Sequence, residues 1–184
     1  DYRNKEASIF TNALDGAHHG SIIKIAICIR KPILFTLGID RSIKIWNLQT
    51  NNQELNHQFE IEPLSLSVHP SGIFVCISFR TIIQIYNYTI DSLTLFKQFE
   101  ISNSQSIEYS YQGHILSISY DYIIQFHHHY DYNKYTYIRA NDKFRLIRWA
   151  RDDSFIITVD FDELVIRWDP YTGQRLSQMI WLYV

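Results

Sequence analysis

The chain has 184 residues, of which 46% are hydrophobic and 20% are charged, and its formal net charge is −2. This composition is typical of a globular protein with a sizeable core, and its 17 basic residues are spread among 19 acidic ones. Nucleic-acid-binding domains usually gather Lys and Arg on one face, so no nucleic-acid partner is predicted. The apolar runs are shorter than the ~20 residues that cross a bilayer, so no membrane contact is predicted and a cytoplasmic protein is expected.

The two cysteines, Cys28 and Cys76, each lie inside an apolar stretch and belong to no CxxC pair. This placement predicts buried thiols in a reducing compartment. A disulfide framework is therefore not expected.

Aromatic residues recur along the chain at nearly constant spacing. Trp46, Tyr86, Phe126 and Trp168 are separated by 40, 40 and 42 residues, and each closes a short apolar run. A repeat of ~40–45 residues with Trp at such a place is typical of a blade of a WD-type β-propeller. The predicted fold is therefore all-β: about four blades of four antiparallel strands, as an incomplete propeller or a fragment.

The four units divide the chain at similar intervals. Within each unit, runs of alternating apolar residues mark the strands. Turn residues, such as Pro70-Ser71-Gly72, mark the breaks between them. The predicted boundaries are 1–17 for the end of a preceding blade or a linker, 18–60, 61–100, 101–139 and 140–178 for the blades, and 179–184 for a tail or the start of a further blade.

The predicted strands of each blade, in chain order, surround the strand that carries the recurring aromatic. In the first blade they span 23–29, 33–37, the run that ends at Trp46, and 54–59. In the second they span 64–68, 73–78, 82–86 and 93–99. The third has 107–110, 115–120, 123–126 and 135–138, and the fourth has 144–149, 155–159, 164–168 and 174–177. Four open blades would expose strand edges, so the isolated chain is expected to be poorly soluble or to dimerise.

A hydrogen-bonded network is predicted in the first blade. Asp40 precedes Trp46 by six residues, Thr36 lies four residues before Asp40, and His18 lies upstream. A buried Asp is costly unless it is hydrogen-bonded, so these polar residues are interpreted as structural anchors and not as catalytic groups.

The other blades keep less of this network. The fourth has Thr158 and Asp162 before Trp168, but Ala140 stands where the His is expected. The second and third have Arg80 and Tyr120 at the Asp position. Those two blades, with Tyr86 and Phe126 as their aromatics, are expected to depend more on packing.

Tyrosines are concentrated in the third unit and in the loop that follows its aromatic strand. Tyr side chains are enriched in protein interfaces, because they bury a large area with few rotatable bonds. Tyr130, Tyr132 and Tyr135 are therefore the predicted partner-contact surface.

His127-His128-His129 and Asp131 are the residues that most resemble metal ligands. Neighbouring residues on a strand point to opposite faces, so at most His127 and His129 share a face. An exposed polar loop is the favoured interpretation, and a metal-dependent site is the alternative. No metal or cofactor is predicted, and because no GxSxG, GxGxxG or HExxH motif occurs, no enzyme activity is predicted.

Several segments, in their order and spacing, carry a resemblance to one family. They are residues 28–32 (CIRKP), 40–47 (DRSIKIWN), 69–72 (HPSG), 90–91 (ID), 96–99 (FKQF) and 152–154 (DDS). Together they resemble the WD-repeat region of the cilia- and flagella-associated protein fifty-seven family of the axoneme. The resemblance covers roughly residues 18–176.

The resemblance implies a non-enzymatic scaffold of the ciliary axoneme that helps to position inner dynein arm and regulatory components on doublet microtubules, and so supports motility. It implies other axonemal proteins as partners, together with further propeller blades or a coiled-coil chain. The blade pattern alone equally permits a general WD40 adaptor subunit of a cytosolic complex, such as a coat, a ligase or ribosome assembly.

Overall fold

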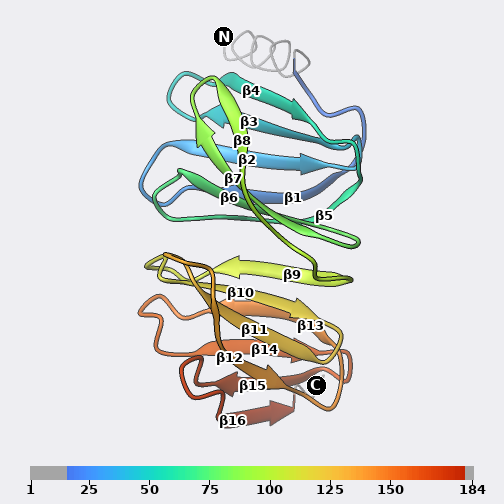
Figure 1. Cartoon of the computed structure of the whole chain (residues 1–184), viewed down its shortest axis with the longest axis vertical. Coiled ribbons are helices and arrows are strands. Elements are labelled where there is room, and N and C mark those ends of the chain that lie inside the picture. The colour runs from blue at the N-terminus through green and yellow to red at the C-terminus, as the bar shows by residue number, and fades with distance from the viewer. Residues whose placement is uncertain (1–15, 181–184) are drawn as a thin grey trace, which may run out of the picture.

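The computed structural model describes residues 16–180, which form sixteen β-strands and no helix within that range. The strands make four separate four-stranded sheets, each built from strands that are consecutive in the chain. Every strand pair in these sheets is antiparallel, as hairpin connections of a few residues require. In Figure 1 the first two sheets overlap in the upper half of the view, and the last two overlap in the lower half.

Each sheet is one blade. The first consists of β1 (Ile22–Ile27), β2 (Ile33–Gly38), β3 (Ser42–Asn47) and β4 (Asn52–Gln58). The second consists of β5 (Pro63–Val68), β6 (Phe74–Phe79), β7 (Ile83–Thr89) and β8 (Ser92–Phe99). The third consists of β9 (Ser104–Tyr109), β10 (Ile115–Tyr120), β11 (Ile123–His128) and β12 (Lys134–Arg139). The fourth consists of β13 (Phe144–Trp149), β14 (Ile156–Asp160), β15 (Leu164–Trp168) and β16 (Arg175–Ile180).

The predicted fold class is confirmed: the chain is all-β, in a propeller-type arrangement of four four-stranded blades. Trp46, Tyr86, Phe126 and Trp168 all lie on the third strand of their blades and are largely buried. The recurring aromatic thus marks the same strand four times.

Within residues 16–180, the hydrophobic core consists of three clusters, and each one lies between two successive blades. Phe35 and Tyr88 meet edge to face in the first cluster, with ring centroids 5.5 Å apart. Each blade therefore buries its apolar residues against a neighbour, as a propeller requires. The first strands of the blades pack in the order β1, β5, β9, β13 and line the axis of the arrangement.

A repeated hairpin joins the second and third strands of three blades. Arg41, Asp121 and Glu163 each lie five residues before the recurring aromatic and have φ of 61°, 46° and 61°. A left-handed residue at such a place matches the twist of a tight β-hairpin. In each of these three blades, the hairpin consequently places the residue that precedes the left-handed one at the same end of the blade.

Candidate functional site: inter-blade surfaces

The predicted polar residues of the first blade lie in one hydrogen-bonded chain. Trp46 Nε1 donates to Thr36 Oγ1 at 2.9 Å, and His18 Nε2 lies 2.8 Å from the same hydroxyl. His18 Nδ1 lies 3.1 Å from Asp40, which also accepts the Ser42 hydroxyl at 2.7 Å. This hydrogen-bonded network joins the segment before β1 to β2 and β3, so it holds the blade together across strands.

Asp40 is the most highly connected member of this network. Its carboxylate accepts the backbone N–H groups of His19 and Ser42 at 2.8 Å and 3.1 Å, in addition to its side-chain partners. Burial alone would raise the pKa of Asp40, but the hydrogen bonds from Ser42, His18 and His19 hold it well below its ordinary value. Asp40 is therefore an ionised structural anchor.

The fourth blade keeps only part of the network. Trp168 Nε1 donates to Thr158 Oγ1 at 2.9 Å, matching the first blade. The expectation for Asp162 was wrong, because this residue is exposed at the hairpin tip. Asp160 instead accepts the backbone N–H of Leu164 at 2.8 Å. Leu164 stands where the first blade has Ser42, so a carboxylate at position 162 has no hydroxyl to hold it.

The second and third blades replace the network by packing. Tyr86 donates its hydroxyl to Gln84 Oε1 at 2.7 Å. Phe126 has no polar atom and packs edge to face with Trp149 of the next blade, with ring centroids 5.9 Å apart. The Trp149 indole in turn donates to Ser117 Oγ at 3.0 Å, so an indole from the fourth blade bonds to the third.

The three tyrosines of the predicted contact surface have different environments. Tyr130 is 79% exposed, whereas Tyr132 is only 3% exposed, so the expectation of a contact role for Tyr132 was wrong. A left-handed backbone at Tyr132, with φ of 58°, accompanies a ring that packs in the core between the second and third blades. Tyr135 is half-buried and donates to the carbonyl of Pro170 at 3.1 Å. Tyr130 is therefore the solvent-exposed tyrosine of the three.

The histidine run after the third aromatic is used in packing. His127 is buried and bonds to the carbonyl of Tyr132 at 2.9 Å. His129 stacks on His69 of the second blade, with ring centroids 4.0 Å apart. Burial lowers the pKa of His69 to about 4, helped by His129. Among residues 16–180, no group of three or more His, Cys, Asp or Glu side chains has the geometry to hold a metal ion.

The two cysteines lie in the core and are not joined. Both are free and buried. Cys28 Sγ donates to the carbonyl of Pro70 in the second blade at 3.3 Å, and burial raises the pKa of the Cys76 thiol far above its ordinary value. Both thiols are therefore structural, as their apolar surroundings predicted.

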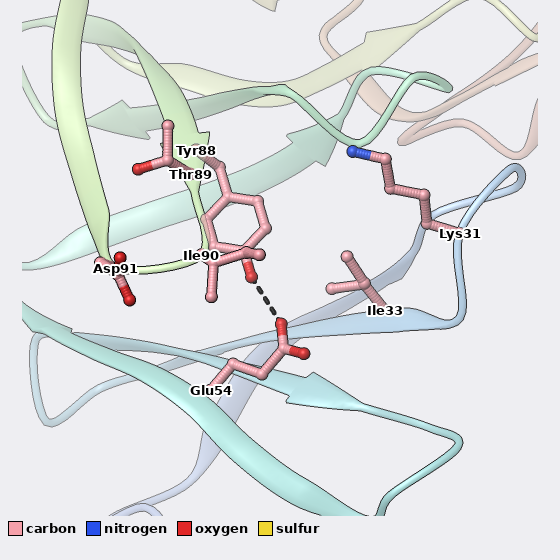
Figure 2. Close-up of a pocket in the computed structure, with 7 residues that line it drawn as sticks. All are labelled: Lys31, Ile33, Glu54, Tyr88, Thr89, Ile90 and Asp91. Atoms are coloured by element: carbon pink, nitrogen blue, oxygen red, sulfur yellow. Dashed lines mark hydrogen bonds between the residues drawn. The ribbon is translucent and has the colours of Figure 1, made fainter.

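A cleft opens between the first and second blades at their outer side. It has a volume of about 620 Å³ and is lined by Lys31, Ile33, Glu54, Tyr88, Thr89, Ile90 and Asp91. Figure 2 shows the Tyr88 hydroxyl pointing at Glu54, to which it donates at 2.7 Å. The cleft combines an apolar wall with carboxylates, which is a surface suited to a protein partner.

A second hollow, of about 250 Å³, lies along the axis and is lined by residues of the inner strands. Glu108 of β9 accepts from Arg148 of β13 at 3.5 Å, and Lys24 of β1 donates to Ser65 of β5 at 3.4 Å. The second Glu108 oxygen is buried and has no hydrogen-bond partner within the described part of the chain. Four blades thus contribute to one polar cluster.

Glu108 is expected to make stability depend on pH near neutrality. Burial raises its pKa to about 7 from an ordinary 4.5, against the opposing charges of Arg148 and Lys24. Between these values the folded chain binds more protons than the unfolded chain, so this contribution to stability falls as pH rises. We compare the free energies of unfolding of Glu108→Gln and wild type, measured in urea. We expect the difference between them to shift by ~2 kcal/mol in favour of Glu108→Gln as the pH is raised from 5 to 8.

A matched control for this prediction is Glu100→Gln, because Glu100 is exposed. Its stability difference from wild type should stay constant over the same pH range. A Glu108→Gln difference that is equally flat with pH would contradict the prediction.

No family model matches the chain. It is 28% identical over 176 residues to mouse cilia- and flagella-associated protein 57, covering 95% of the chain and 14% of that relative. It is 31% identical over 153 residues to cilia- and flagella-associated protein 57 A of Tetrahymena thermophila, covering 82% of the chain and 12% of that relative.

A solved structure supports the fold alone. Hydrazine synthase of Kuenenia stuttgartiensis superposes with a TM-score of 0.75 at 14% identity, over 91% of this chain and 52% of that one. No helix in residues 16–180 is long and apolar enough to span a membrane.

The chain spans only 12% to 14% of the length of the two ciliary relatives described above. Over most of its own length, it is homologous to cilia- and flagella-associated protein 57.

Proposed function

We propose that the chain is a non-enzymatic protein-interaction scaffold of the ciliary axoneme. The observation that carries this proposal is the match to ciliary proteins over 82% to 95% of the chain. The propeller-type fold supports it, because stacked blades present broad surfaces and clefts between repeats. The conspicuous polar residues also support it, since Asp40 and Thr158 serve structural hydrogen bonds.

We further propose that the scaffold helps to position inner dynein arm and regulatory components on doublet microtubules, and so supports ciliary motility. Its partners on this account are other axonemal proteins, with further propeller blades or a coiled-coil chain beside it. The exposed Tyr130 and the half-buried Tyr135 are candidate contacts to such proteins.

Fractionation of ciliated cells tests the proposal. A tagged chain should remain on detergent-extracted axonemes after the membrane and matrix have been removed. Recovery only from the soluble cytosol would overturn the axonemal proposal and favour a general adaptor of a cytosolic complex, which the blade pattern alone permits.

A further inference from the structure

We propose that the cleft between the first and second blades binds an arginine or lysine side chain of a partner protein. This inference rests on the proposed scaffold function and names the chemistry of one contact. It is carried by the placement of Glu54, Asp91 and the apolar residues beside them.

Glu54 is a partly buried carboxylate that neutral groups hold in place. Its Oε1 accepts Asn47 Nδ2 at 2.8 Å, and its Oε2 accepts the Tyr88 hydroxyl at 2.7 Å. A carboxylate offers about four lone-pair sites, so Glu54 retains capacity for two more donors. A cation that arrived in the cleft would therefore find an oriented acceptor that needs no rearrangement.

Among the described residues, no Lys, Arg or His side chain forms a salt bridge with Glu54 or Asp91. Within the described range, 16–180, the salt bridges are His18–Asp40 and Arg148–Glu108, and both lie outside the cleft. In the view of Figure 2, Ile33 lies between the Lys31 amine and Glu54, and no dashed line joins these two side chains. The Lys31 stem lies over Gly72, where an added Cβ would be 3.2 Å from Lys31 Cδ.

Asp91 adds a second negative charge on the other side of Tyr88. Burial raises the pKa of the Tyr88 hydroxyl, and the carboxylates of Glu54 and Asp91 raise it further. Both charges therefore act on the same small volume. Their combined field favours a positively charged ligand and disfavours an acidic one.

The apolar wall suits the stem of a long basic side chain. Ile90 is 73% exposed at the tip of the turn between β7 and β8, and Ile33 forms the floor at 9% exposure. Arg and Lys bury their methylene stems on apolar surface while their charged heads reach polar groups. Arg fits best, because its planar fork can make paired hydrogen bonds to a carboxylate.

Methyl NMR of the isoleucine-labelled chain provides the test, with N-acetyl-arginine amide as the probe. We expect saturable shifts of the Ile33 and Ile90 methyl signals. The neutral isostere N-acetyl-citrulline amide should give none at the same concentrations. Glu54→Gln keeps an acceptor for Tyr88 but removes the charge, and should weaken arginine binding about tenfold.

The control variant is Glu100→Gln, which removes an exposed carboxylate outside the cleft and should bind arginine like wild type. Unchanged signals from the buried Ile118 and Ile166 would show that each variant keeps the fold. Equal shifts with citrulline, no saturation with arginine, or full binding by Glu54→Gln would each overturn the proposal. The axoneme fractionation is read separately, so failure of the scaffold function would be distinguishable.

Discussion

Asp40→Ala is expected to lower the free energy of unfolding by about 2–4 kcal/mol, measured by urea titration. Asp40 accepts the hydroxyl and N–H of Ser42, bonds to His18 and accepts the N–H of His19. Truncation leaves these groups without their acceptor, and the His18–Thr36–Trp46 chain loses its anchor.

The effect should also depend on pH in a defined direction. The pKa of Asp40 lies below its ordinary 3.8, so its ionisation stabilises the folded chain above that value. This contribution is lost as pH falls through the folded-state pKa, and the difference between wild type and Asp40→Ala should shrink on acidification.

Asp162→Ala is the matched control, because Asp162 precedes Trp168 by the same six residues and is exposed. We expect its free energy of unfolding to stay within ~0.5 kcal/mol of wild type. Equal losses in the two variants would contradict the assignment of a structural anchor to Asp40 alone.

Gly113→Ala is expected to cost about 3 kcal/mol or more of unfolding free energy. Gly113 has φ of +89°, which an L-residue rarely adopts. An added Cβ would also collide with the ring of His69, coming within 2.9 Å of its Cε1. That ring is held by its 3.0 Å bond to the Gly113 carbonyl and by the stacked His129, so it has little room to move.

A double-mutant cycle separates the two causes of this loss. In a His69→Ala background the collision is absent and only the backbone strain remains, so Gly113→Ala should then cost about 1 kcal/mol. The same cost in both backgrounds, measured by urea unfolding, would show that the His69 contact plays no part.

The fold could be predicted because its signal is periodic. Trp46, Tyr86, Phe126 and Trp168 recur at the third strand of each blade, and alternating apolar residues flank them. Strand pairing within a blade is local, so short turns between apolar runs were enough to order the strands.

The contacts between blades were harder to predict, because they depend on residues far apart in the chain. Tyr132 lies in a polar loop, yet its hydroxyl is 3.1 Å from that of Tyr109 in the core. The Glu54–Tyr88 bond joins residues 34 positions apart, and no local pattern signals it. The loss of a partner for Asp162 was visible in the sequence only as Leu164 in place of a hydroxyl residue.

The most direct test of the scaffold account is a density map of the intact axoneme at side-chain resolution. The account predicts a propeller in which Trp46, Tyr86, Phe126 and Trp168 occupy successive blades, beside the base of an inner dynein arm. Axonemal density of that quality in which no propeller fits this pattern would contradict it.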